Sequence, residues 1–149
     1  MRIRGRGGAS VFLTPRGWEF RQGTGPTDDR WLVINAGAVL DDGSSWSFTE
    51  PCLLIDEARE LSRWLVGAGT GWGTSARFRS LAFIEQLVSF EVAGRTGAPE
   101  LLVRAFFQDE GAPGWARGGQ AVDLHVRPRQ LLAAAEVWAT ELAALPARP

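Results

Sequence analysis

Apolar and polar residues alternate along much of the chain with a period of two, which is the pattern of half-buried β-strands. Ala9 to Thr14 is the first such segment, and Pro15-Arg16-Gly17 is expected to turn the chain into a second strand. In that second strand Trp18 and Phe20 would face inward and Glu19 outward. The start of the chain therefore predicts a pair of short strands.

The most apolar segment is Arg30 to Leu40. It carries apolar residues at both odd and even positions, which point to opposite faces of a strand. This composition is typical of a strand covered on both faces, so we expect it to be central in its sheet. Asp42-Gly43 tolerates the positive φ angles of a tight hairpin, and Ser45-Trp46-Ser47-Phe48 then alternates polar with aromatic residues. The pattern predicts a second strand that pairs back antiparallel.

A helical period replaces the strand period after this hairpin. Thr49-Glu50-Pro51 has the composition of a helix start, because proline fits the first turn and the Thr49 hydroxyl can accept a free amide. The apolar stripe that follows consists of Leu54, Ala58, Leu61 and Leu65. Gly67 is the expected end of the helix, and the four glycines in Gly67 to Gly73 predict a flexible connector.

The second half of the chain predicts further strands and a terminal helix. At least one strand is expected within Arg77 to Ala93, followed by a hairpin loop over Gly94 to Gly97 and a strand over Leu101 to Phe107. Gln108 to Gly119 is expected to be a loop. Another strand should direct three apolar residues inward, namely Val122, Leu124 and Val126. Pro128 should open a helix to about Leu145 with the buried stripe Leu131, Ala135, Trp138, Leu142 and Leu145.

The fold class predicted from these elements is α+β. The connections between strands are too short for parallel crossovers, so antiparallel pairing should dominate a sheet of about six to eight strands. Two amphipathic helices, one in the middle of the chain and one at its end, have the apolar stripes needed to cover that sheet. At 149 residues and without a linker segment, residues 1–149 are expected to form a single domain.

The charge of the chain is nearly balanced, with a formal net charge of −1 and a pI of about 5.9. This argues against a dedicated nucleic-acid-binding protein, which would be strongly basic. The N-terminal sequence Arg2-Ile-Arg-Gly-Arg-Gly-Gly resembles arginine-glycine tails that bind RNA, but a disordered or edge-strand start is the favoured interpretation. A single cysteine requires no oxidising compartment, and no segment approaches a signal peptide or membrane span. We therefore expect a cytoplasmic protein without a membrane partner.

Acidic residues concentrate in one part of the sequence. Residues 1–30 carry six arginines against three acids, whereas residues 31–60 carry six acids against one arginine. The candidate acidic surface comprises Asp28, Asp29, Asp41, Asp42, Glu50, Asp56, Glu57 and Glu60. Hairpins and helix starts attract acids in any case, so a solvated face is the alternative to a binding surface.

Seven tryptophans are the most unusual feature of the composition. The pattern places Trp18, Trp31, Trp46, Trp64 and Trp138 on inward stripes. Trp72 and Trp115 instead fall in glycine-rich segments, where each could anchor a protein interface or fold back onto the domain. They are candidate partner-binding residues.

Residues suited to catalysis or metal binding are sparse. Cys52 and His125 could form a thiol–imidazole pair, but a buried cysteine and an outward histidine are the favoured interpretation. One histidine and one cysteine supply no metal-ligand spacing, and the glycine-rich connector lacks a nucleotide-binding motif. Glu50 with Glu85, or Asp109 with Glu110, are possible acid–base pairs that the sequence does not bring together. We expect no catalytic, metal or cofactor site.

A set of short motifs resembles the WapI-type immunity proteins, small bacterial proteins that neutralise a secreted nuclease toxin. They are D-x-x-W-L-V at Asp28 to Val33, the Gly43 turn, W-S-F-T-E-P-C-L-L at Trp46 to Leu54 and R-W-L ending at Leu65. Phe83 to Glu91 is similar to the family's F-x-E-P-x-L-x-F-E, with Gln86 in place of proline. Ala112 to Trp115 matches a proline-rich turn ending in tryptophan.

The resemblance implies a noncatalytic protein that binds a cognate toxin domain, by analogy one that cleaves RNA. Acids would then suit a partner that must present positive charge to grip phosphates. A small carboxylate-based hydrolase or ligand-binding domain is one alternative, and a generic protein-interaction module is another. A secreted toxin with a variable C-terminal domain in the neighbouring reading frame would favour the immunity function.

Overall fold

The computed structural model describes residues 1–20, 30–71, 79–94, 97–108 and 119–146. Within these residues the chain forms eight strands and two helices. The first half contains β1 (Arg2–Arg4), β2 (Ser10–Trp18), β3 (Trp31–Val39), β4 (Ser45–Leu54) and α1 (Ile55–Thr70). The second half contains β5 (Arg79–Ala82), β6 (Val88–Ala93), β7 (Leu101–Phe107), β8 (Gln120–Val126) and α2 (Pro128–Ala143).

The strands pair as two antiparallel sheets, each with its strands in sequence order. The N-terminal sheet has the order β1-β2-β3-β4 and the C-terminal sheet the order β5-β6-β7-β8. The α+β class, the antiparallel pairing and the two helices are thus confirmed, with the strands divided between two sheets. The order of elements, four strands followed by a helix, occurs twice along the chain, although no sequence repeat signals it.

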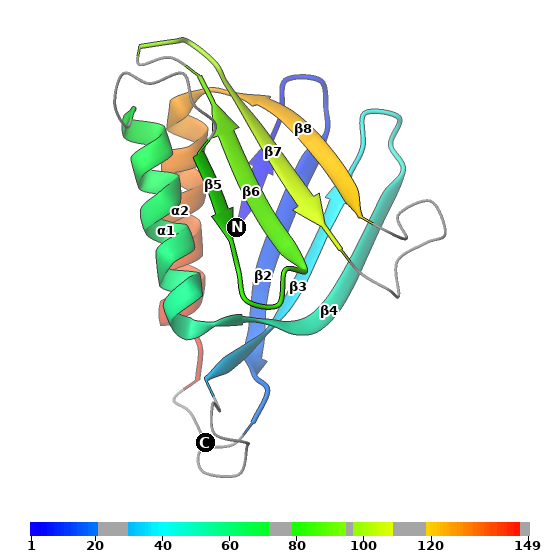
Figure 1. The fold of residues 1–149 in the computed structure, drawn as a ribbon, viewed down its shortest axis with the longest axis vertical. Helices are drawn as coiled ribbons and strands as arrows, with labels where there is room; N and C mark the ends of the chain where they lie inside the picture. The colour runs from blue at the N-terminus through cyan, green and yellow to red at the C-terminus, as the bar shows by residue number, and fades with distance from the viewer. Residues whose placement is uncertain (21–29, 72–78, 95–96, 109–118, 147–149) are drawn as a thin grey trace.

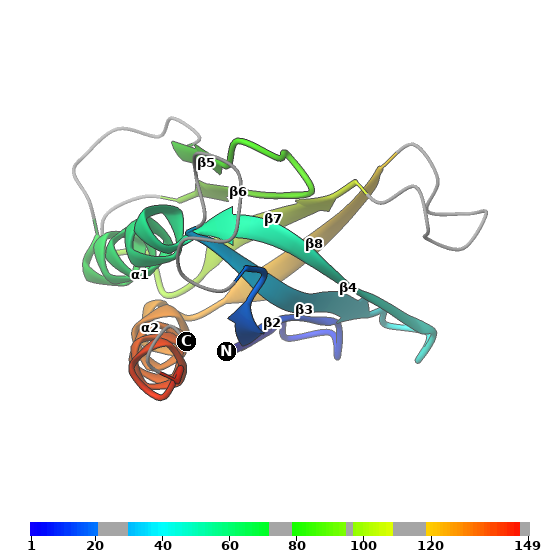
Figure 2. The same ribbon diagram turned by 90° about the horizontal axis from the view of Figure 1, so that it is seen from below.

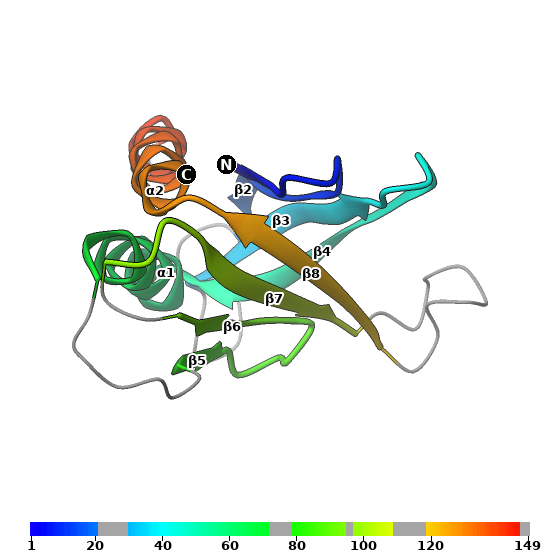
Figure 3. The same ribbon diagram turned by 90° about the horizontal axis from the view of Figure 1, so that it is seen from above.

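The two sheets lie across one another, and the helices lie side by side along one flank (Figure 1). Views from below and above show the same arrangement, with the sheets splayed apart at the side opposite the helices (Figures 2 and 3). The sheets meet where the Arg6 N–H donates to the His125 carbonyl oxygen at 2.9 Å. Within the described ranges, neither helix is long and apolar enough to span a bilayer.

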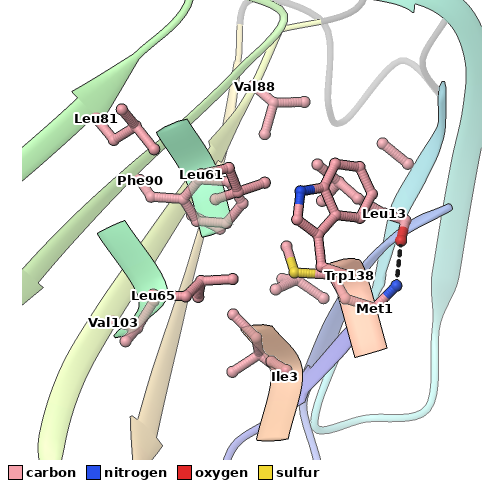
Figure 4. Packing of buried hydrophobic residues seen from close by; sticks show 14 of the residues in the cluster. Met1, Ile3, Leu13, Leu61, Leu65, Leu81, Val88, Phe90, Val103 and Trp138 are labelled. Carbon is pink, nitrogen blue, oxygen red and sulfur yellow. Dashed lines mark hydrogen bonds between the residues drawn. The ribbon is translucent and has the colours of Figure 1, made fainter. Parts of the chain in front are cut away.

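One hydrophobic cluster contains residues from both sheets and both helices. Figure 4 shows Trp138 of α2 among side chains of α1, β2 and the start of the chain. Its Nε1–H donates to the carbonyl oxygen of Ala58 in α1 at 2.7 Å. The buried α-ammonium group of Met1 donates to the Leu13 carbonyl oxygen at 2.6 Å and pairs with Glu141. The predicted burial of Trp46 and Trp138 is confirmed.

The hairpin between β3 and β4 follows the prediction. The Leu40 N–H donates to the Ser44 carbonyl oxygen at 2.8 Å, and Gly43 adopts a φ of +83°. β3 lies between β2 and β4, so its central position is also confirmed. The prediction that both of its faces are covered is wrong, because Trp31 and Val33 are only half-buried on the outer face. Trp31 was predicted to face inward, and this prediction is also wrong.

The start and the end predicted for α1 are both wrong. Thr49, Glu50 and Pro51 belong to β4, and the helix begins at Ile55. β4 is an edge strand whose pairing is irregular opposite Leu32 and Val33, and proline is tolerated at such positions. Thr49 Oγ1 accepts a hydrogen bond from the Asn35 side chain of β3 rather than from a helical amide. Buried Gly67 continues the helix, which ends at Thr70 and is capped by Gly71 with a φ of +79°.

The predicted turn at Pro15 to Gly17 is also wrong, because β2 continues through it. The register with β3 shifts by one residue between Pro15 and Gly17, which identifies a β-bulge. A bulge accommodates proline and glycine without ending the strand. Trp18 faces inward beyond the bulge but remains partly exposed, with its Nε1–H donating to the Pro146 carbonyl oxygen at 3.1 Å.

The strands of the second half agree with their patterns. β7 has the predicted bounds, β6 lies within the predicted range, and the inward residues predicted for β8 are buried. The departure from the family motif at Gln86 has a structural counterpart, because Gln86 adopts a φ of +52° in the turn before β6. Proline is restricted to a φ near −65°, so it could not occupy this turn as it stands.

Candidate partner-binding surface

The structure separates the predicted acidic surface into two parts. Asp41 and Asp42 lie in the hairpin before β4, whereas Asp56, Glu57 and Glu60 lie in the first turns of α1. The ten residues of β4 separate them, a length of about 30 Å for an extended strand. Figure 1 shows the hairpin tip and the start of α1 at opposite ends of β4. Asp28 and Asp29 lie outside the described residues.

The two hairpin acids stabilise local structure. Asp41 Oδ1 accepts a hydrogen bond at 2.7 Å from the Ala9 N–H, which ties the hairpin to the start of β2. Asp42 Oδ1 accepts hydrogen bonds from the hydroxyl and the N–H of Ser44, and these bonds lower the pKa of the Asp42 carboxyl. Both carboxylates therefore have partners within the fold.

Asp56 at the start of α1 is largely neutralised. Its carboxylate receives the Arg30 guanidinium at 2.9 Å and the Arg59 guanidinium at 3.0 Å. All three side chains are at least half-exposed, so the pairs contribute little stability. Their main effect is to cancel the charge of Asp56 as seen by a partner.

Glu57 connects α1 to the C-terminal sheet. Its carboxylate accepts the Leu54 N–H at 2.8 Å, as in a capping box, and the Ile84 N–H at 2.7 Å. Ile84 lies in the turn between β5 and β6, so a single half-buried carboxylate joins the beginning of the helix to a turn of the other sheet. The geometry assigns Glu57 a structural role.

The uncommitted acids on this side of the molecule are Glu50, Glu60 and Glu85. All three are exposed, and none has a hydrogen bond or ion pair with another of the described residues. Glu50 and Glu85, with Glu57, lie close enough to Cys52 for their charges to help raise its pKa. Ile84, next to Glu85, is 66% exposed. We call Glu50, Asp56, Glu57, Glu60, Ile84 and Glu85 the α1-start surface.

Glu85 and Ile84 were not among the partner-binding residues predicted from the sequence. They are more than 20 residues from the α1 acids in sequence, and only the crossing of the two sheets brings their turn to α1. The sequence held no signal for them, because the exposure of Ile84 is visible only in the fold. Trp72 and Trp115 lie outside the part of the chain that the structure describes.

A groove of about 610 Å³ lies beside this surface, between the start of α1 and the end of α2. Asp56, Arg59 and Arg63 line its α1 side, and Ala139 and Leu142 line its α2 side. Small-molecule pockets have volumes in this range, but their walls are predominantly apolar, whereas three charged side chains line the α1 side of this groove. Within the described ranges, no three His, Cys, Asp or Glu side chains gather as metal ligands.

Cys52 is buried in β4, and His125 lies on the exposed face of β8. Burial, together with the negative charges of Glu57, Glu50 and Glu85, raises the pKa of the Cys52 thiol to about 12. The thiol is therefore protonated at neutral pH and is not a nucleophile.

We expect Cys52 to resist alkylation by iodoacetamide at pH 8 in the folded protein and to react readily in urea. Because the folded pKa of about 12 exceeds the ordinary value of 9.0, ionisation favours the unfolded chain. The stabilising contribution is therefore complete below pH 9 and is lost as the pH rises toward 12. Rapid labelling of the native protein, followed by mass spectrometry, would contradict this assignment.

These features define a two-sheet α+β protein with a surface of uncommitted acids around an exposed isoleucine. The chain belongs to the immunity protein WapI-like family, which it matches over residues 2–146. No curated protein sequence matches it.

Two solved structures resemble the fold at low sequence identity. One is of the plant transcriptional regulator PBF-2, with 12% identity, a TM-score of 0.51 and coverage of 97% of this chain and 80% of that one. The other is WHY3 from Arabidopsis thaliana, with 12% identity, a TM-score of 0.48 and coverage of 97% and 86%. At this identity the likeness to PBF-2 concerns the fold alone.

Proposed function

We propose that this protein is a noncatalytic, cytoplasmic immunity protein that neutralises a cognate secreted toxin by forming a one-to-one complex with its RNA-cleaving domain. Membership of the immunity protein family over nearly the whole chain carries this proposal. The protonated state of Cys52 at neutral pH agrees with a function that needs no thiol chemistry.

The α1-start surface is the part of the molecule that best suits such a partner. An RNA-cleaving domain must present positive charge to hold phosphates, so exposed acids on the inhibitor accelerate the encounter and match the site electrostatically. Glu50, Glu60 and Glu85 are available for this role because none is committed to a described neighbour. Ile84 supplies an apolar side chain of the kind that becomes buried at the centre of an interface.

The hairpin acids are less suitable for contact with a partner. Asp41 is held by Ala9 and Asp42 by Ser44, so changing either would alter the turn as well as the charge. Asp56 contributes little to the negative electrostatic potential that a partner would meet, because two arginines pair with it. The α1-start surface therefore replaces the continuous acidic stretch inferred from sequence as the toxin-facing region of this proposal.

Reversing Glu60 and Glu85 to lysine should slow association with the toxin domain encoded in the neighbouring reading frame by roughly tenfold at low salt, because exposed charges act chiefly on the encounter rate. The salt dependence of the on-rate should weaken in parallel. Stopped-flow or surface-plasmon measurements at two ionic strengths would determine both quantities, and the melting temperature should stay within a few degrees of wild type.

Glu136→Lys, on the exposed side of α2, is the control because it makes the same kind of charge reversal, at one position, away from this surface. Equal on-rates for the Glu60/Glu85 variant and wild type would place the interface elsewhere while leaving the immunity function intact. Failure of the wild-type protein to bind or inhibit the neighbouring toxin would contradict the immunity function itself.

A further inference from the structure

Several cationic side chains gather around one concavity near the start of α2. A pocket of about 440 Å³ lies where the N-terminal sheet, the C-terminal sheet and the start of α2 meet. It is lined by Arg6, Glu100, His125, Arg127, Arg129 and Gln130. Three guanidinium groups and an imidazole thus face a single carboxylate.

The walls of this pocket are fixed by hydrogen bonds that do not use the cationic groups. The Gln130 side chain accepts the Arg127 N–H at 2.8 Å through its oxygen and donates to the Arg4 carbonyl oxygen at 2.9 Å through its nitrogen. The Arg6 N–H donates to the His125 carbonyl oxygen at 2.9 Å. The elements that carry the charges are therefore held together by backbone groups and the Gln130 side chain, and the arginine side chains are not used in these bonds.

The guanidinium groups are weakly committed or uncommitted. Arg6 approaches Glu100 at 3.8 Å, and its side chain is 80% exposed, which makes this a weak pair. Arg127 and Arg129 are exposed and have no ion pair among the described residues. Clustering like charges is unfavourable without an anion, and the positive end of the α2 dipole adds to the same field.

We propose that this pocket binds a small phosphate-bearing anion of the size of pyrophosphate or a nucleoside diphosphate. Arginine guanidinium groups hold phosphate oxygens in paired hydrogen bonds, and three arginines against one glutamate leave an excess of positive charge for a multiply charged group. The Gln130 and Arg6 hydrogen bonds preorganise the site before the ligand arrives.

The lining distinguishes this ligand from a nucleic-acid strand. The lining residues include no phenyl or indole side chain on which bases could stack, and the one imidazole is that of His125, whereas single-strand binding surfaces depend on several stacking platforms. Glu100 is itself a lining residue, and its carboxylate would repel a continuous phosphodiester backbone that passes through the pocket. The N-terminal Arg-Gly sequence resembled an RNA-binding tail, but in the fold its Arg6 lines this pocket.

Calorimetric titration of the full chain with pyrophosphate at fixed ionic strength tests this proposal. We expect saturable one-site binding and a rise in melting temperature for the wild-type protein. In the double variant Arg127→Ser and Arg129→Gln, affinity should fall by about 100-fold, because removing each charge-assisted hydrogen bond weakens binding roughly tenfold. Serine is a favoured helix N-cap, so this variant should fold without ligand as well as wild type does.

The control variant Arg16→Gln with Arg63→Gln removes two arginines outside the pocket and should bind pyrophosphate like the wild type. Equal weakening in the control would show nonspecific ionic attraction and overturn the proposal, as would the lack of saturable binding by wild type. An acidic peptide that binds as tightly as pyrophosphate would assign the pocket to a protein segment instead. Tighter binding of a short 5′-hydroxyl RNA than of pyrophosphate would overturn the assignment to a free ligand.

Discussion

Replacing Trp138 with alanine is expected to lower the free energy of unfolding by about 3–5 kcal/mol. The side chain is fully buried and belongs to the cluster that joins both sheets to both helices. Its removal leaves a cavity that neighbouring elements cannot fill without moving together. A domain of this size has a total stability of about 5–15 kcal/mol, so the variant should unfold at a markedly lower urea concentration.

The indole also joins the two helices through its hydrogen bond to Ala58. Trp138→Phe keeps most of the buried ring but loses the donor, so we expect a smaller loss of about 1–3 kcal/mol. Val137→Ala is the control, because Val137 is adjacent in sequence but 48% exposed, and it should cost roughly 0.5 kcal/mol or less. A Trp138→Ala transition no lower than that of the control would contradict the central position of this side chain.

Glu57→Ala should have the second largest effect, a loss of about 2–4 kcal/mol in the free energy of unfolding. The carboxylate accepts two backbone N–H groups from different parts of the fold, and each charge-assisted bond is worth about 1.5–3 kcal/mol before an allowance for partial exposure. Glu57→Gln retains one acceptor oxygen and should lose about half as much. Urea denaturation measures both changes.

Glu60→Ala is the matched control one turn further along α1. Glu60 is exposed and pairs with no described residue, so its removal should change the unfolding free energy by about 0.5 kcal/mol or less. Hydrogen exchange at Ile84 gives a second measurement, because its amide should exchange faster once the Glu57 acceptor is removed. Unchanged exchange at Ile84 in Glu57→Ala would show that the carboxylate does not hold this turn.

The sequence predicted most of the fold because periodicity is a local signal. The alternation in β8 gave the correct inward residues, the apolar segment of β7 gave the correct bounds, and Asp42-Gly43 gave the correct hairpin. Two of the errors fell at Pro15 and Pro51, where the same residue types suit both a turn or helix start and a bulged strand. Tertiary pairing with β3 decided between these conformations, and a local pattern does not contain that information.

The candidate surface was less predictable because it depends on interactions between distant segments. The sequence identified Glu57 only as an acid of the candidate surface. Its structural role depends on the hydrogen bond from the Ile84 N–H, and the two residues meet only because the sheets cross. Glu85 likewise lies near Cys52 and Glu50 only because the fold brings its turn to β4. The charges of Asp41 and Asp56 were correctly located in the sequence, but their partners were visible only after folding.

The displacement of Pro51 from the helix into β4 bears on how the protein avoids aggregation. Among the described strands, β4 has a neighbour on one side only, and its other edge offers backbone groups to an extended chain that approaches it. Proline cannot donate a hydrogen bond, and the irregular pairing opposite Leu32 and Val33 increases the local twist of the edge. A foreign strand would therefore fail to pair along the full length of β4, which protects this edge of the N-terminal sheet from fibril-like growth.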